Sequence, residues 1–321
     1  MRQSIRGLSC RRKNDESFGW NNTIFQKGAT DVQNVLIMPS ERSSLIRSVR
    51  AFFRRDKFAA IAGILLVVIV TAAIIGPLVW RYQPNDIDLD EALQSPSMSH
   101  PLGTDNQGRD ILARTLTGAR ISLGIAVAAA IISLLLGSVI GLIAGFAGGP
   151  VDSFAVSIID IALAFPSLLL AIAISVIIPP GMVSVFVALS LVGWPTFARL
   201  SRSIFLSIKQ SEFYVAALAT GCSGPRLILG HALPNCIPLL IVAVSLRLGG
   251  FMLGEAALSF LGLGVQPPAA SWGAMISNGR NFLHVAPWIS VFPGIALALT
   301  IMAMNLLGDS LRDYLDPRMK M

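Results

Sequence analysis

The chain has 321 residues, of which 54% are hydrophobic and 13% are charged, with a mean hydropathy of +0.68 and a formal net charge of +7. This composition excludes an ordinary soluble globular domain and is typical of membrane proteins. A positive charge can indicate nucleic-acid binding, but these basic residues cluster beside apolar segments, which indicates membrane topology instead. Cys10, Cys222 and Cys236 are odd in number and lack a CxxC spacing, so they predict neither a disulfide framework nor a metal site.

Residues 1–57 are polar and contain twelve Lys and Arg residues but no apolar run. No segment before the first membrane span has the apolar core of a signal peptide. We expect a disordered cytoplasmic tail. A second hypothesis is that translation begins at Met38, in which case residues 1–37 lie upstream of the true start.

Residues 58–80 are a charge-free run of 23 residues, and about 20 suffice to cross the hydrocarbon core of a bilayer. Basic residues precede this run, and Trp80 at its end and Tyr82 just after it suit the far interface. The pattern predicts a first transmembrane helix that starts in the cytoplasm. The following residues 81–119 are polar, and we expect them to form an extracytoplasmic loop.

The loop 81–119 is rich in carboxylates, among them Asp105 and Asp110. A calcium site built from these two residues is one interpretation. The EF-hand spacing of oxygen ligands is absent, however, so we interpret the acidic residues as structural.

Residues 120–308 hold five more apolar segments, which together with the first predict an all-α polytopic membrane protein with six transmembrane helices. The expected spans are 58–80, 121–146, 153–178, 181–198, 236–264 and 286–308. Residues 309–321 are a short charged tail. Glycines recur every fourth residue from Gly137 to Gly149, which favours close packing against another helix. Pro166 predicts a kink in the third span.

The stretch 211–235 separates the fourth and fifth spans and is rich in small residues. Ser211 is a plausible N-cap, with Glu212 in the first turn, where the helix dipole favours an acid. Gly221 suits a helix end, and we expect Pro234 to stop a second short helix. The pattern predicts an exposed helix–turn–helix that docks into a partner. An ordinary loop lying on the lipid headgroups is the alternative.

The distribution of basic residues predicts the orientation. The two tails and the region 199–226 hold 19 Lys and Arg residues, and the opposite side holds five. Counting only residues 42–57 of the long first tail still leaves 13 against five. We therefore expect both termini and the stretch 211–235 in the cytoplasm.

Three stretches resemble the permeases of ABC importers, in particular those of the dipeptide/oligopeptide/nickel family. Ala216-Ala217, Gly221 and Leu233-Pro234 resemble the "EAA" loop of these permeases. Residues 100–110 and 255–268 resemble further stretches of the same family, and the likeness covers about residues 44–320. Val215 stands where the motif often has a glutamate, and His231 stands where it has an isoleucine.

The resemblance implies a type I importer permease in the inner membrane of a bacterium. Such a subunit works with a second homologous permease, two ABC ATPase subunits and an extracytoplasmic solute-binding protein, which the acidic loop 81–119 would contact. It implies a coupling loop over residues 200–235. The residues expected to couple to the ATPase are Glu212, Ala216, Ala217, Gly221, His231, Leu233 and Pro234. Di- and oligopeptides are the expected cargo, with nickel chelates, opines, glutathione and oligosaccharides as alternatives.

Three ionisable residues lie inside predicted spans, where a charge is costly: Asp160, Arg247 and Glu255. Arg247 and Glu255 are eight residues apart, about 12 Å along a helix, so we expect each to find a partner elsewhere. We interpret them as candidates for lining a translocation path. The alternative is that they anchor contacts between helices.

Enzyme classes find little support. The chain has no GxxxxGK[ST] motif, so we expect ATP to be bound only by partner subunits, with no cofactor or metal of its own. Its three histidines, His100, His231 and His284, are too scattered for a zinc site. The main rival class is a secondary transporter, which predicts inverted repeats and broken helices at the membrane midplane. A passive membrane anchor is disfavoured by charges inside the spans.

Overall fold

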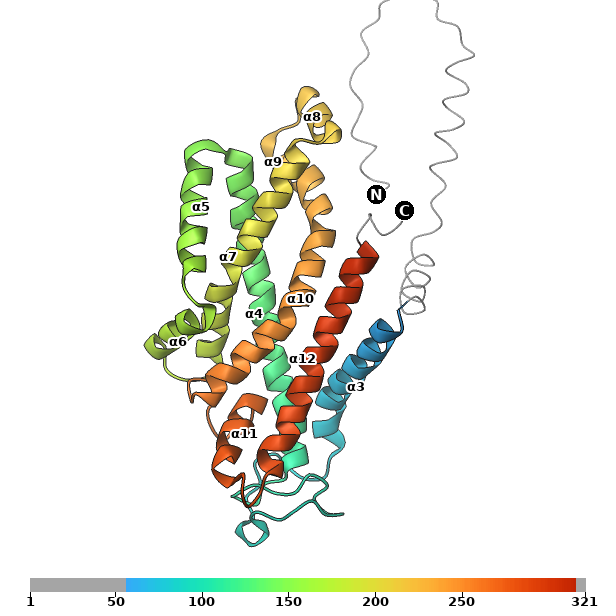
Figure 1. Cartoon of the computed structure of the whole chain (residues 1–321), viewed down its shortest axis with the longest axis vertical. Coiled ribbons are helices and arrows are strands. Elements are labelled where there is room, and N and C mark those ends of the chain that lie inside the picture. The colour runs from blue at the N-terminus through green and yellow to red at the C-terminus, as the bar shows by residue number, and fades with distance from the viewer. Residues whose placement is uncertain (1–55, 316–321) are drawn as a thin grey trace, which may run out of the picture. The chain divides into compact units, whose positions relative to one another are not determined.

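The computed structural model describes residues 56–315, and that part of the chain is all-α (Figure 1). Five of its helices are long and apolar enough to cross a membrane, and a bent pair of shorter helices makes a sixth crossing if it is counted as one. The five are α3 (Lys57–Val79), α4 (Ile111–Ala147), α7 (Met182–Lys209), α10 (Leu233–Phe260) and α12 (Trp288–Leu315). The expectations for residues 1–55, including a start at Met38, and for residues 316–321 lie outside the described residues.

α3 begins and ends one residue before the predicted span 58–80. Asp56 is its N-cap, and the Asp56 carboxylate accepts a hydrogen bond from the backbone N–H of Phe58 at 2.9 Å. The same carboxylate accepts a hydrogen bond from the Ser310 hydroxyl near the end of α12 at 2.6 Å. That bond lowers the pKa of Asp56. The first and last spans are thereby joined at one end.

The second span was placed too late by the sequence pattern. The expected loop 81–119 ends at Asp110, where α4 begins, ten residues before the predicted start of the span. The Asp110 carboxylate caps this helix by accepting the N–H of Ala113 at 2.7 Å. Two arginines of this region, Arg114 and Arg120, lie on the helix. Arg114 donates to the carbonyl of Pro84, and Arg120 donates to the carbonyl of Ile74.

The third span is broken where a kink was expected. α5 (Gly149–Ala164) and α6 (Ser167–Ile177) meet at an angle of 92°. Pro166 lacks the N–H that would continue α5, and proline disfavours the helical region for the residue before it. Phe165 accordingly adopts an extended conformation, with φ −84° and ψ 138°.

The fourth and sixth spans continue as helix beyond their predicted ends. α7 extends eleven residues past Ala198 to Lys209, and the expected tail from residue 309 starts as the last turns of α12. Arg199 and Arg202 therefore lie on a helix and form ion pairs with α5, Arg199 with Asp160 and Arg202 with Asp152. The first charged residue after each apolar run therefore does not mark the end of the helix.

The glycine stripe of α4 packs against α7, the most extensive contact between two helices in the described region. A Cβ at Gly137 would lie 2.4 Å from the Trp194 carbonyl oxygen, and one at Gly141 would lie 2.2 Å from that of Ala198. Gly149 does not belong to this contact, because it opens α5 and a Cβ there would meet nothing within 4 Å. Close helix packing was the expected use of the stripe.

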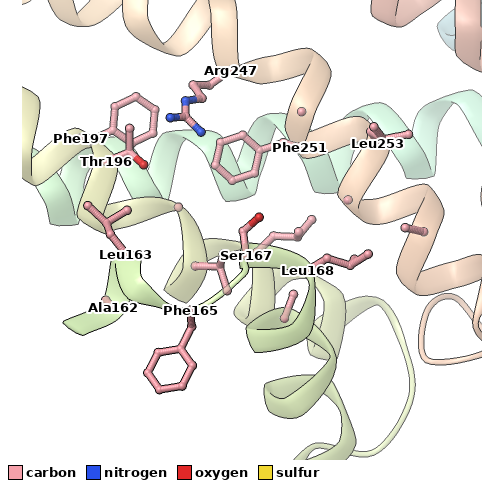
Figure 2. A pocket seen from close by; sticks show the side chains of 17 residues that line it. Ala162, Leu163, Phe165, Ser167, Leu168, Thr196, Phe197, Arg247, Phe251 and Leu253 are labelled. Atoms are coloured by element: carbon pink, nitrogen blue, oxygen red, sulfur yellow. The ribbon is translucent and has the colours of Figure 1, made fainter. Parts of the chain in front are cut away.

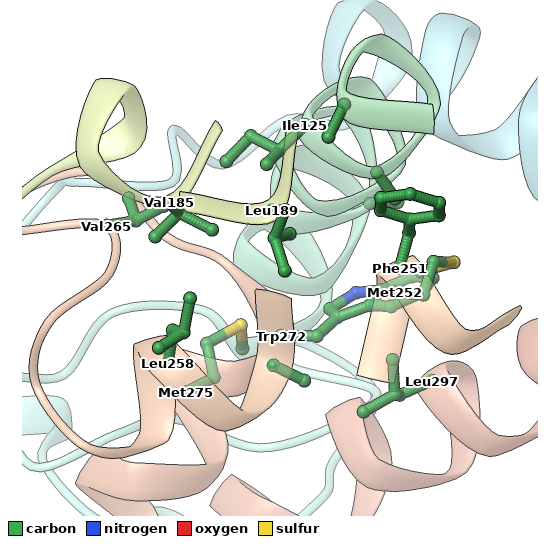
Figure 3. Packing of buried hydrophobic residues seen from close by; sticks show 14 of the residues in the cluster. Ile125, Val185, Leu189, Phe251, Met252, Leu258, Val265, Trp272, Met275 and Leu297 are labelled. Carbon is green, nitrogen blue, oxygen red and sulfur yellow. The ribbon is translucent and has the colours of Figure 1, made fainter. Parts of the chain in front are cut away.

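A buried apolar cluster fills the half of the bundle opposite α8 (Glu212–Ala219), around the short helix α11 (Trp272–Gly279). Figure 3 shows Trp272 between side chains of α10 and α12, among them Met252 and Leu297. The indole N–H of Trp272 donates to the Thr115 carbonyl at 2.9 Å, which joins α11 to α4. The segment 265–285, between the predicted fifth and sixth spans, thus contains a helix that completes the core.

Candidate coupling surface and membrane cavity

α8 is a short helix at one end of the bundle, on the same side as the start of α3 and the end of α12 (Figure 1). Ser211 occupies its N-cap position as expected, but the hydroxyl donates to the Ile208 carbonyl and makes no side-chain cap. Glu212 lies exposed in the first turn. Gly221 follows the helix with φ +79°, in the left-handed region that glycine adopts without strain.

Several apolar side chains of α8 are exposed on different sides of the helix. Phe213, Val215 and Leu218 are 46%, 54% and 57% exposed, and Ala216 is also exposed. Surfaces of this kind mark interaction sites when they are contiguous. Because Val215 has no hydrogen-bonding side chain, Glu212 is the acidic group on this helix.

The side of α8 that carries Tyr214 is anchored in a second buried cluster. Its members come from α4, α7, α8, the following η2 (Leu227–Ala232) and α10: Leu142, Phe205, Tyr214, Leu227, Ala232, Cys236 and Leu240. Tyr214 packs edge-to-face on Phe205 with ring centroids 6.0 Å apart, and its burial raises the pKa of the phenol. Ala217 and Leu233 are half-buried against the same cluster. A displacement of α8 is therefore transmitted to α4, α7 and α10, which pack on the same cluster.

Pro234 does not end a helix, contrary to the sequence-based expectation. The chain runs helically from α9 (Gly224–Arg226) through η2, a π-helical segment that contains His231, into α10. The N–H of Leu233 bonds to the Ile228 carbonyl five residues earlier. Pro234 lies in the first turn of α10, where a missing N–H is tolerated, and the wider π turn accommodates the transition.

A cavity of about 490 Å³ lies where α5 and α6 break, between them and the middle of α7 and α10 (Figure 2). Arg247 of α10 lines this cavity, and its place on a translocation path stays a prediction. The hydroxyl groups of Thr196 and Ser167 face the same space, and the rest of the lining is apolar or glycine. Sequence reasoning missed Thr196 and Ser167, because nothing in their local pattern indicates that they face a cavity.

Asp160 and Glu255 do not line this cavity. Asp160 pairs with Arg199 across α5 and α7, on the exposed side of both helices. Glu255 is fully buried, with one carboxylate oxygen accepting from the Ser259 hydroxyl at 2.7 Å. As expected, Glu255 does not pair with Arg247. Its hydrogen-bond partner is Ser259, one turn along the same helix. Both residues serve contacts within the protein.

The loop 81–110 contains a buried histidine that sequence analysis passed over as scattered. His100 lies between two carboxylates, with Nδ1 2.8 Å from Asp110 Oδ2 and Nε2 2.9 Å from Glu91 Oε2. Asp110 also accepts the indole N–H of Trp80 at 3.0 Å, and Asp105 accepts the guanidinium of Arg109 at 2.7 Å. Both aspartates thus accept hydrogen bonds from protein donors, and within residues 56–315 no group of three or more His, Cys, Asp and Glu side chains is arranged to hold a metal ion.

Comparison with known proteins decides between the classes that these features leave open. The family of binding-protein-dependent transport system inner membrane components matches residues 137–321, more than half of the chain. The chain belongs to this family. The N-terminal transmembrane domain of oligopeptide transport permease C matches residues 44–96 in addition. This permease is therefore an integral membrane protein and a transport subunit, and its broken helix pair is no sign of a secondary transporter.

Individual relatives cover most of the chain. The dipeptide transport system permease protein DppC of Alkalihalophilus pseudofirmus is 42% identical over 83% of this chain and 88% of its own length. The oligopeptide transport system permease protein OppC of Bacillus subtilis is 38% identical over 92% of this chain and 97% of its own. The glutathione transport system permease protein GsiD of Pectobacterium atrosepticum is 39% identical over 84% and 89%.

Proposed function

We propose that this permease carries di- or oligopeptides into the cell as one of two membrane subunits of an ATP-driven ABC importer. The observation that carries the proposal is the exposed α8, held on a cluster that joins α4, α7 and α10, in a chain of this family. Relatives named for dipeptide and oligopeptide transport support peptides as the cargo. A relative named for glutathione transport favours a second candidate of similar chemistry, glutathione.

The partners follow from what the chain has and lacks. The sequence contains no phosphate-binding GxxxxGK[ST] loop, so ATP is bound by two separate ATPase subunits and the permease needs no cofactor. Phe213, Val215 and Leu218 of α8 enter a groove on one of these subunits, with Glu212 at the rim of the contact. A second permease completes the translocation path. A solute-binding protein docks on the opposite side, at the loop 81–110.

The orientation agrees with the charge count. Basic residues number 13 on the side of α8 and five on the other, even when only residues 42–57 of the long tail are counted. This excess supports an orientation with α8 and both termini in the cytoplasm, where ATP is available. ATP-driven closure of the ATPases then moves α8, and the buried cluster transmits the movement to the long helices around the cavity. Arg247 lines the path, whereas Asp160 and Glu255 hold helices together.

Copurification from the native membrane in mild detergent tests the docking role of α8. The ATPase subunits should copurify with wild-type permease. Most of them should be lost from the purified Gly221→Asp variant, because this substitution adds a charge beside the exposed apolar side chains of α8. A Cβ at Gly221 meets nothing within 4 Å, so the substitution causes no clash inside the permease.

Gly149→Asp is the matched control. Gly149 also has a positive φ, +54°, and also has open space around its Cβ, but it lies at the turn between α4 and α5. This variant should retain the ATPases. Loss of the ATPases in both variants would show a backbone effect and would remove the support for docking through α8. Wild-type permease that copurifies alone and takes up solute without ATP would overturn the proposed function.

A further inference from the structure

We propose that Arg247 and its cavity form a subsite for a free carboxylate of the transported solute. The inference rests on the proposed transport function and adds the chemical group that the membrane path recognises. It is argued from the lining of the cavity, from the partners of the arginines and from the break between α5 and α6.

The cavity is apolar except at one place. Seventeen residues line it, and Arg247 is the only charged residue among them. Ser167 and Thr196 are the only other polar side chains in the lining, and Figure 2 shows their hydroxyl groups on the same space as the guanidinium. A small number of polar groups in an apolar pocket fixes the orientation of a ligand, while the apolar surface accepts varied side chains.

Arg247 forms no hydrogen bond or ion pair within residues 56–315, unlike the arginines of α4 and α7. Arg199 and Arg202 pair with aspartates of α5, and Arg114 donates to the loop before α4. A guanidinium at membrane depth is costly without a partner and normally faces protein or water. The planar guanidinium matches a carboxylate with two parallel hydrogen bonds, so an incoming carboxylate supplies the missing partner.

The break between α5 and α6 explains how a polar group reaches Arg247. Non-helical backbone at membrane depth is tolerated only where it is buried in protein or lines a watery cavity. Phe165 and Pro166 are exposed at the break, and residues on both sides of it, Leu163 and Ser167, line the cavity. We therefore expect water in the cavity, through which a hydrated carboxylate can enter.

A carboxylate fits the cargo better than other anions do. Dipeptides, oligopeptides and glutathione differ in length and side chains, but each carries at least one free carboxylate. One cation among apolar walls recognises that shared group and ignores the rest of the molecule. Specificity for particular side chains then belongs to other parts of the transporter.

Uptake by the complete transporter in proteoliposomes tests the subsite. The probes are labelled trialanine and its C-terminal amide, and the variants are Arg247→Met and Arg247→Lys. Each variant is compared with wild type for each peptide separately, which cancels any preference of the binding protein. Arg247→Met should slow ATP-driven uptake of trialanine about tenfold or more and change uptake of the amide less than twofold. The rate of trialanine uptake by Arg247→Lys should lie between those of wild type and Arg247→Met, because lysine keeps the charge but cannot form the two parallel hydrogen bonds.

A control and a second measurement keep the test decisive. Arg280→Met removes an exposed arginine outside the cavity and should leave the acid-to-amide ratio unchanged. Binding of trialanine to the detergent-purified transporter, without binding protein or ATP, should weaken about tenfold in Arg247→Met. If wild type does not take up the amide, the trialanine binding measurement alone tests the carboxylate subsite.

The two proposals fail in different ways. Wild-type transporter that takes up neither peptide with ATP and contains no ATPase would overturn the transport function. Wild type that transports trialanine while Arg247→Met binds and transports it equally well would overturn the carboxylate subsite alone. An equal loss of uptake for acid and amide in Arg247→Met, with unchanged trialanine binding, would also overturn it and give Arg247 a role in assembly or gating.

Discussion

Gly141 lies where α4 approaches α7 closely, and a Cβ there would be 2.2 Å from the Ala198 carbonyl oxygen. We expect Gly141→Ala to destabilise the permease by roughly 1–3 kcal/mol, because the two backbones must separate. Gly124→Ala in the same helix is the control, since its added methyl meets nothing within 4 Å and alanine favours helix. Thermal unfolding in detergent measures both, and equal midpoints for the two variants would contradict the close approach.

The sequence located Gly141 and Arg247 but not their neighbours. Glycine spacing is a local pattern, and a charge in an apolar run is visible by inspection, so both could be singled out. The contacts of His100 with Glu91 and Asp110 depend on a folded loop that no local period encodes. Thr196 and Ser167 face the cavity only because α6 turns back beside α7.

Two ion pairs of different exposure join helix α5 to α7. The less exposed pair should stabilise the contact between these helices more than the exposed pair does. Arg202 binds Asp152 through two hydrogen bonds of 2.5 and 2.6 Å, and both side chains are mostly buried. We expect Asp152→Asn and Arg202→Gln each to lower stability, and the double variant to lose less than the sum. The coupling should be on the order of 1 kcal/mol or more, because charged two-bond pairs are the strong ones.

The pair Asp160 and Arg199 serves as the comparison, since their side chains are 55% and 59% exposed. Exposed ion pairs contribute little, so the cycle with Asp160→Asn and Arg199→Gln should give a coupling near zero. Unfolding midpoints of the six variants measure both cycles. Equal coupling in the two cycles would show that burial does not decide the strength of these pairs.

The helices themselves were largely predictable, whereas their ends and directions were not. Apolar length placed α3 to within one residue at each end. The same rule cut α4 and α7 short, because Arg114 and Arg202 were counted as loop residues although they find partners on the helices. Pro166 marked the position of a bend, but the angle of 92° depends on how α6 packs on α7 and α10.

The two ends of the bundle differ chemically, and we expect this difference to set the direction of the permease in the membrane. One end carries α8 and the larger number of basic residues, and the other carries the loop 81–110 with its acidic residues. Because basic segments stay in the cytoplasm, the two ends should be reachable from opposite sides of a sealed membrane. Met98 is fully exposed in the loop, and Glu212 is exposed on α8, so each can carry a reporter without disturbing the core.

Single cysteines at these two positions test the direction. In a background with Cys10, Cys222 and Cys236 replaced by alanine, Met98→Cys should react with a membrane-impermeant maleimide in right-side-out vesicles only. Glu212→Cys should react in inside-out vesicles only, and ATPase subunits docked on α8 should slow that reaction. Labelling of both positions from the same side would imply an even number of crossings between them and would contradict the three that α4, the pair α5 and α6, and α7 make. Labelling in the reverse sense would place α8 away from ATP and remove its role in coupling.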